Sequence, residues 1–185
     1  SVEAYRDGRI RRHELTRPAK EQDRVRQIAA LDAQTGPVFL VYRAAPQIDA
    51  RLGALCDEPP VIDITAGDGV RHQLWPVADA EAIAALSADF DALGRLYIAD
   101  GHHRAAAAAR VADERRKAKS AGTSSHGASH GASHGASPDA QAPRPSEHFL
   151  AVLFPHDQLR VLPYNRVVSD LNGLAPEAFL ARIAE

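Results

Sequence analysis

The sharpest cluster of chemically capable residues in the sequence is the run DGHHR at positions 100–104. It follows the short apolar run 95–99, which predicts a buried strand, and precedes an alanine-rich stretch, 105–120, which predicts a helix. A helix that begins directly after a strand points its free N–H groups and the positive end of its dipole at one spot. Phosphate and other anions bind at such a spot, so the pattern predicts an anion site.

Each residue of this run has a suitable chemistry. Gly101 permits a tight turn and the close approach of a ligand. His102, His103 and Arg104 add hydrogen-bond donors, and a guanidinium suits a phosphate in particular. Asp100 could hold Mg²⁺ or accept a proton. The alternative is a polar surface turn in which the histidines only cap the helix.

A second polar cluster, RHELTR, occupies positions 12–17. Glu14 is a candidate general base within it, and the neighbouring cations could hold phosphate. Lys20, Asp23 and Arg24 continue the cluster at spacings of three and four residues, which places them on one face of a predicted helix. The alternative is a solvated surface crossed by ion pairs.

Composition narrows the classes of protein to consider. Lys and Arg total 22 against 24 Asp and Glu, giving a net charge of −2 that argues against a nucleic-acid binder. No apolar run approaches the length of a membrane span, and no signal sequence opens the chain. The single cysteine, Cys56, excludes an internal disulfide and a cysteine-cluster zinc site, and predicts a cytoplasmic protein.

The remaining patterns predict an α/β fold with a mixed sheet and flanking helices. Asp-Gly at 7–8 and the run AGDG at 66–69 favour hairpins. Apolar periodicity and capping residues predict helices, and continuous β-branched runs predict buried strands. The expected hairpins pair 2–5 with 9–15 and 61–64 with 70–77; the expected helices cover 18–33, 48–55, 79–93 and an opening turn from 174; the further strands cover 37–42, 149–154 and 160–168.

Residues 120–147 differ from the rest in composition. Ser-His-Gly-Ala occurs three times in tandem from position 125, and prolines follow. This predicts a flexible insertion inside a single domain that covers 1–185. The repeat places His126, His130 and His134 at the four-residue spacing of a helical metal site, but its glycines disfavour a helix and favour a neutral repeat expansion. Because the chain starts at Ser1 and lacks methionine, we expect a fragment of a longer protein.

Five stretches resemble a bacterial family catalogued as the domain of unknown function numbered one thousand and fifteen. Together they cover most of the chain outside the insertion, and HELTR and YIADGHHR are the most specific motifs. Members of that family are longer at both ends, in agreement with a fragment. The stretches are YRDGRIRRHELTR at 5–17, LDAQTGPVFLVYR at 31–43, DGVRHQLWPV at 68–77, LYIADGHHRAAAAARVADERR at 96–116 and FLAVLFPHDQLRVLPYNRVV at 149–168.

The DGHHR turn also resembles the phosphate loop of the ParB and sulfiredoxin superfamily, in which free serine kinases combine this turn with an upstream His-Glu pair. Here that pair is His13 and Glu14. The resemblance implies a ParB/sulfiredoxin-like nucleotide-binding core, with Glu14 as the base and Asp100 assisting with Mg²⁺ or the hydroxyl. It also implies that the phosphates are held by Gly101, His102, His103 and Arg104. Sulfiredoxins need a cysteine after the glycine of the turn, and His102 stands there instead.

The sequence therefore predicts a kinase that transfers phosphate from ATP or ADP, with Mg²⁺, to a hydroxyl of a small molecule, and free L-serine is the leading candidate. We expect no nucleic-acid or membrane partner. One alternative is a non-enzymatic regulatory module that binds a nucleotide through the same turn. Another is a scaffold fragment whose site needs segments outside this chain. The candidate substrate-binding residues are His13, Thr16, Arg17, Lys20 and Arg24.

Overall fold

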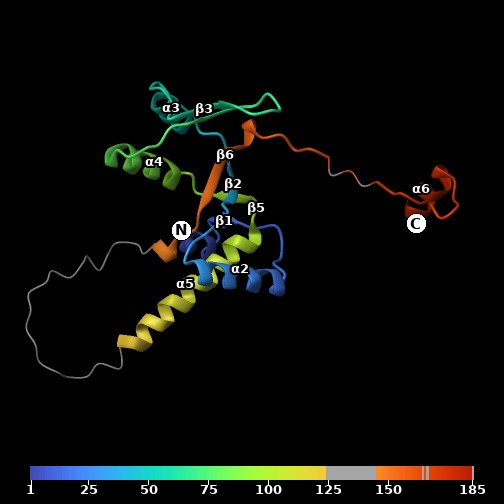
Figure 1. Cartoon of the computed structure of the whole chain (residues 1–185), viewed down its shortest axis with the longest axis horizontal. Coiled ribbons are helices and arrows are strands. Elements are labelled where there is room, and N and C mark those ends of the chain that lie inside the picture. Colours follow the sequence, from blue (N-terminus) through green and yellow to red (C-terminus); the bar gives the residue numbers. More distant parts are fainter. Residues whose placement is uncertain (124–144, 164, 166, 185) are drawn as a thin grey trace, which may run out of the picture.

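A computed structural model describes residues 1–123, 145–163, 165 and 167–184 of the chain. A four-stranded sheet lies at its centre, in the order β1-β5-β2-β6 (Figure 1). β1 is parallel to β5, whereas β2 is antiparallel to β5 and parallel to β6. This mixed sheet with flanking helices confirms the predicted α/β class. The strands are β1 (Ile10–Arg11), β2 (Val38–Tyr42), β5 (Leu96–Asp100) and β6 (Ala151–Pro155).

The main core lies against one face of the sheet. Along β2, Val38, Leu40 and Tyr42 are buried, and the two residues between them are only partly buried. This alternation follows from the two-residue period of a strand. The long helix α5 (His102–Thr123) contributes alanines such as Ala105 to the same core, and their small side chains allow a helix to pack closely.

Helix α2 (Pro18–Leu31) packs along α5 and confirms the helix predicted from residue 18. Val25 of α2 is buried against Ala107 and Val111 of α5. Proline is favourable at the first helical position because its missing N–H has no partner there. This contact holds α2 alongside α5, and both helices line the site described below.

The segment between β2 and β5 also follows the sequence prediction. It contains α3 (Pro46–Leu55), α4 (Ala80–Ala92) and the antiparallel hairpin of β3 (Ile62–Thr65) and β4 (Arg71–Leu74). The carboxylate of Asp79 accepts a hydrogen bond from the first turn of α4, as a capping residue does. Figure 1 shows these elements (cyan to green) together in the upper part of the view.

The N-terminal hairpin prediction is wrong. Residues Val2–Arg6 form the helix α1, and the Asp-Gly turn leads into β1, which pairs with β5 rather than with residues 2–5. Ser1 caps this helix by accepting a hydrogen bond from its first turn. Val2 and Tyr5, three residues apart, are both buried on the same side of the helix. Capping and burial thus favour a helix over a strand.

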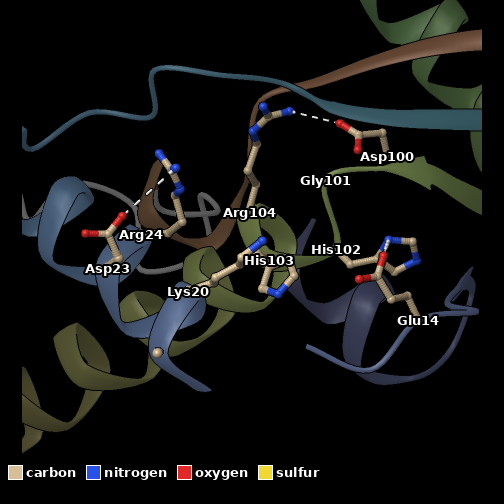
Figure 2. Close-up of a pocket in the computed structure, with 10 residues that line it drawn as sticks. Glu14, Lys20, Asp23, Arg24, Asp100, Gly101, His102, His103 and Arg104 are labelled. Atoms are coloured by element: carbon tan, nitrogen blue, oxygen red, sulfur yellow. Dashed lines mark hydrogen bonds and ion pairs between the residues drawn. The ribbon is translucent and has the colours of Figure 1, made fainter. Parts of the chain in front are cut away.

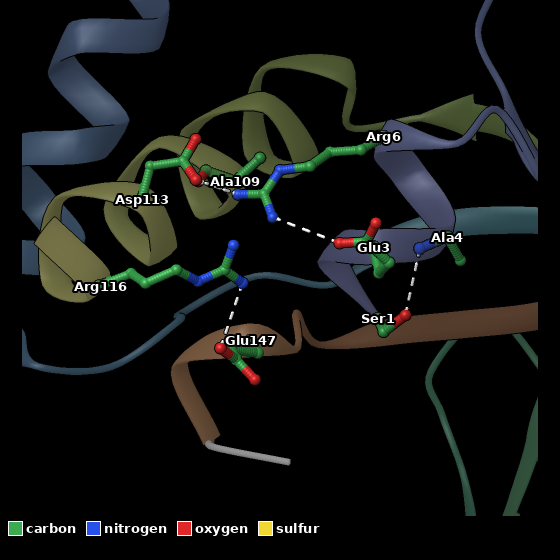
Figure 3. Close-up of polar contacts among 8 residues, drawn as sticks. All are labelled: Ser1, Glu3, Ala4, Arg6, Ala109, Asp113, Arg116 and Glu147. Atoms are coloured by element: carbon green, nitrogen blue, oxygen red, sulfur yellow. Dashed lines mark hydrogen bonds and ion pairs between the residues drawn. The ribbon is translucent and has the colours of Figure 1, made fainter.

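Ion pairs join α1 and the 3₁₀ helix η1 (Pro145–Glu147) to α5 (Figure 3). Arg6 of α1 donates a hydrogen bond to the carboxylate of Asp113. Arg116 lies farther along α5, with its Nη2 atom 3.1 Å from Oε1 of Glu147. An N-terminal segment and a segment that follows α5 in the chain therefore both pack on the helix whose first turn forms the candidate site.

The insertion predicted at 120–147 falls only partly within the described residues. Its start belongs to α5, and its last three residues form η1. The tandem repeats with His126, His130 and His134 lie outside the described residues. The single-domain prediction for 1–185 and the flexibility of the insertion stay predictions.

The last part of the chain departs from the sheet. After β6 the 3₁₀ helix η2 (His156–Gln158) follows, and the described residues of 160–168 contain no strand, so the strand predicted there is wrong. Val161 and Val167 are 96% and 93% exposed, so this stretch lacks the buried face that a paired strand needs. The helix expected from residue 174 is present as α6 (Pro176–Ala184), which lies apart from the sheet (Figure 1).

In the described residues, no helix is long and apolar enough to cross a membrane.

Candidate functional site

The DGHHR run divides between a strand end and a helix start. Asp100 is the last residue of β5, and α5 begins at His102, three residues earlier than predicted. The N–H of Ala105 donates to the carbonyl of Gly101 over 3.0 Å, which closes the first turn of the helix. The N–H groups ahead of it have no partner within the helix and are available to an anion.

Gly101 is required by the geometry of this junction. Its φ is +94°, a backbone conformation that residues with a side chain rarely adopt. A Cβ atom at this position would also lie 3.2 Å from the Cα of Val38 in the neighbouring strand. The glycine therefore lets β5 turn into α5 directly against β2.

The junction opens onto a cavity of about 460 Å³, shown in Figure 2. Helix α2 contributes one wall, the start of α5 contributes another, and Glu14 comes from the loop that precedes α2. Its volume is in the range of small-molecule sites. The lining residues are Glu14, Ala19, Lys20, Asp23, Arg24, Asp100, Gly101, His102, His103 and Arg104.

His102 and Glu14 meet at the inner side of this cavity. The imidazole of His102 is only 3% exposed, and its Nδ1 atom lies 3.5 Å from Oε2 of Glu14. The ring also packs edge-on against that of His13, with a centroid distance of 4.5 Å. Its Nε2 atom is buried without a hydrogen-bond partner. Burial lowers the pKa of His102 and the nearby His13 lowers it further, whereas Glu14 and Asp100 oppose the shift.

This environment favours a neutral His102. A buried N–H without an acceptor is costly, so the proton is best placed on Nδ1, which faces Glu14. The imidazole, which the sequence analysis expected to add a donor for phosphate, is therefore enclosed and not exposed to solvent.

His103 and Arg104 face different partners. Nε2 of His103 accepts a hydrogen bond from the backbone N–H of Arg17 over 3.0 Å, which ties the loop of Glu14 to the start of α5. Nη1 of Arg104 donates to the carbonyl of Pro37 over 2.9 Å and lies 3.4 Å from Oδ2 of Asp100. The guanidinium of Arg104 is therefore held in place while its side chain stays 45% exposed.

The candidate residues outside this cavity have other positions. His13 and Thr16 line a neighbouring cavity, and Arg17 lines neither of these two. The hydroxyl of Thr16 donates to Glu21 over 2.8 Å, and this hydrogen bond is the main reason that the pKa of Glu21 is lowered. Arg17 acts through its backbone in the contact with His103 described above.

Asp23 also lines the cavity. The sequence analysis placed it on one helix face with Lys20 and Arg24 but did not count it among the candidate site residues. Asp23 lies 4.0 Å from the guanidinium of Arg24.

The charges in the cavity are balanced. Lys20, Arg24 and Arg104 are cationic, and Glu14, Asp23 and Asp100 are anionic. A site that only trapped an anion would need the cations alone. The carboxylates add a capacity to accept a proton or to hold a divalent cation.

The residues present fit Mg²⁺ that enters with a phosphate ligand. Within the described part of the chain, no group of three or more His, Cys, Asp or Glu side chains could enclose a metal ion. Mg²⁺, however, is commonly held by one or two carboxylates together with substrate phosphates and water. Asp100, whose carboxylate is 73% exposed at the cavity, is suited to that role.

Fold and site together describe an α/β protein in which a strand, one glycine and a helix N-terminus open onto a charged cavity. The family model described as Protein of unknown function (DUF1015) matches residues 1–185, so the chain belongs to that family, as its motifs predicted. No curated protein and no solved structure matches the chain. The resemblance to ParB, sulfiredoxin and the free serine kinases stays a prediction.

Proposed function

We propose that this protein is a kinase for a small molecule, which transfers phosphate from ATP or ADP to a hydroxyl group. The observation that carries the proposal is that Glu14 lines the same cavity as the first turn of α5. A phosphate-binding element and a carboxylate base in one cavity are the two parts that such a reaction requires.

The start of α5 is proposed to bind the nucleotide phosphates. Free N–H groups at a helix start attract anions, and the positive end of the helix dipole strengthens the attraction. Lys20 has no ion-pair partner among the described residues and lines the same cavity, so its ammonium group is available to a phosphate oxygen. Arg104 offers the guanidinium nitrogens that its contacts with Pro37 and Asp100 leave free.

Glu14 is proposed as the base. Its carboxylate accepts the proton of the attacking hydroxyl as the new bond between oxygen and the terminal phosphorus forms. The bond from that phosphorus to the leaving nucleotide breaks, and the nucleotide departs as ADP from ATP, or as AMP from ADP. The buried imidazole of His102 contacts the carboxylate of Glu14. The side chain of Glu14 is 55% exposed, so a substrate can reach it.

Asp100 is proposed to hold Mg²⁺ that arrives with the nucleotide. Mg²⁺ neutralises part of the phosphate charge when it is bound. Asp100 and Asp23 line the cavity and would repel the phosphates of a nucleotide. The positive charge of Mg²⁺ would offset that repulsion, which accounts for carboxylates in a cavity that is proposed to bind phosphate.

Free L-serine is the proposed acceptor, because the DGHHR turn and the His13-Glu14 pair resemble those of free serine kinases. The test is phosphorus NMR of the chain mixed with Mg²⁺, ATP or ADP, and L-serine. We expect a phosphoserine resonance that requires L-serine and is lost in Asp100→Asn.

The variant Glu14→Gln is expected to lower transfer by at least about a hundredfold, which is the contribution of a general base, while nucleotide binding persists. Glu177→Gln, which alters an exposed carboxylate on α6, is the matched control and should leave transfer unchanged. Nucleotide binding without transfer would instead favour the regulatory module, and transfer undiminished in Glu14→Gln would remove Glu14 from its assigned role.

A further inference from the structure

A second cavity adjoins the first and shares Glu14 with it. Its volume is about 420 Å³, and it lies beside the loop that connects β1 to α2. Among the residues that line these two cavities, Glu14 is the one common to both. Glu14 is therefore the residue at which the two cavities meet, and only the first cavity is formed by the start of α5. The second is lined by Tyr5, Arg12, His13, Glu14, Leu15 and Thr16.

Arg12 brings a positive charge to this second cavity. Its guanidinium carbon lies 4.8 Å from the centre of the Tyr5 ring, and Nη1 lies 3.4 Å from the tyrosine hydroxyl oxygen. Tyr5 is 6% exposed and belongs to the main core, so it is a rigid support for the guanidinium. Arg12 forms no ion pair with a carboxylate of the described residues.

An arginine that is fixed in place but lacks an anionic partner is suited to bind an anionic ligand. A guanidinium binds a carboxylate through two parallel hydrogen bonds and so also sets its orientation. Arg12 and Glu14 are two residues apart, so their Cα atoms are separated by at most about 7 Å. One small molecule can therefore reach both side chains.

We propose that this second cavity binds the acceptor, and that the acceptor is a small hydroxy acid whose carboxylate is held by Arg12. Its hydroxyl lies beside Glu14, where the two cavities meet, so that the oxygen can attack the terminal phosphorus of the nucleotide in the first cavity while the carboxylate accepts the proton. The inference rests on the proposed kinase function, and it assigns the nucleotide and the acceptor to two cavities that meet at one residue. Arg12 is thus a specificity-determining residue.

The kinetic test compares Arg12→Gln with Arg11→Gln. Arg11 is exposed on β1 and lines neither cavity, so it is a matched control. We expect Arg12→Gln to raise KM for L-serine about tenfold or more, the effect of losing a charge-assisted hydrogen bond, without changing KM for the nucleotide. Arg12→Lys, which keeps the charge but loses the planar fork, should fall between the two.

Ethanolamine supplies a second criterion, because it is L-serine without the carboxylate. The unaltered chain should prefer L-serine strongly, and Arg12→Gln should lose most of that preference. An unchanged KM for L-serine in Arg12→Gln, or a raised KM for the nucleotide alone, would overturn the assignment.

A binding measurement separates this inference from the kinase proposal. L-serine added to the unaltered chain should shift the NMR signals of the Arg12 side chain and the Tyr5 ring, and ethanolamine should not. A shift without any phosphate transfer would support the acid-binding cavity and refute the kinase. Transfer without a shift at Arg12 would support the kinase and refute this cavity as the acceptor site.

Discussion

Nδ1 of the buried His102 lies 3.5 Å from Oε2 of Glu14. This contact joins the first turn of α5 to the loop before α2, two segments that are far apart in the chain. Hydrogen bonds within ligand-free sites are often long and tighten when a substrate binds. The arrangement makes His102 a positioning residue for the proposed base.

The two amide variants of His102 should therefore differ. Asparagine places its NH₂ group near the position of Nδ1, and glutamine places it near Nε2. Since Nδ1 faces Glu14 and Nε2 has no partner, we expect His102→Asn to retain transfer activity and His102→Gln to lose about tenfold or more in kcat. KM for the nucleotide should be similar in both variants.

The split between kcat and nucleotide binding gives a readout that a general loss of packing would not produce. A misplaced base slows the chemical step and leaves the turn at the start of α5 intact, so kcat should fall in His102→Gln while nucleotide affinity stays that of the unaltered chain. Recovery of kcat in His102→Asn is the second criterion. Equal rates in the two variants would reduce His102 to a packing residue.

The sequence predicted those elements whose signals are local. Continuous apolar runs marked β2 and β5, and the proline at position 18 together with helical periodicity marked α2. The placement of the DGHHR run between a strand and a helix could also be predicted, because a short apolar run ends before it and an alanine-rich stretch begins after it. These elements bring most of the candidate residues to one cavity.

Features that depend on tertiary contacts were not readable. The Asp-Gly pair at 7–8 suits a hairpin on local grounds. The helix α1 is favoured instead because Val2 and Tyr5 are buried in the main core, which is a long-range effect. In the same way, successive helix residues point roughly 100° apart, so the sequence does not tell which of His102 and His103 faces inward. The packing of the loop before α2 decides this.

Stability should depend on pH through His102. Its imidazole is surrounded by His13, Glu14, Asp100 and His103, and burial lowers its pKa in the folded chain. Below about pH 6.5 the unfolded chain binds a proton at this residue more readily than the folded chain does. The contribution of His102 to the free energy of unfolding should therefore decrease as the pH is lowered below about 6.5. Above that pH the contribution should stay constant.

Thermal unfolding followed by circular dichroism between about pH 5 and pH 8 measures this dependence. His102→Asn has no imidazole to titrate, so its melting temperature should fall less at acid pH than that of the unaltered chain. His72→Asn, at an exposed position on β4, should keep the full dependence. Parallel curves for the unaltered chain and His102→Asn would contradict the assignment.

Replacing Gly101 with alanine should destabilise the fold and also distort the turn that is proposed to bind phosphate. The backbone conformation at φ +94° is strained for alanine, and the new Cβ would press against the backbone of Val38. A strained residue of this kind costs about 1–3 kcal/mol of the free energy of unfolding. Because the strain falls at the first turn of α5, Gly101→Ala should also weaken nucleotide binding.

Gly53→Ala is the control, since Gly53 lies inside α3 with nothing within 4 Å of the new Cβ. Alanine is favoured over glycine in a helix by roughly 0.5–1 kcal/mol, so this variant should be as stable as the unaltered chain or slightly more so. Urea denaturation measures both changes, and a Gly101→Ala chain with an unaltered midpoint and unaltered nucleotide affinity would show that the close contact of β5, α5 and β2 does not constrain the site.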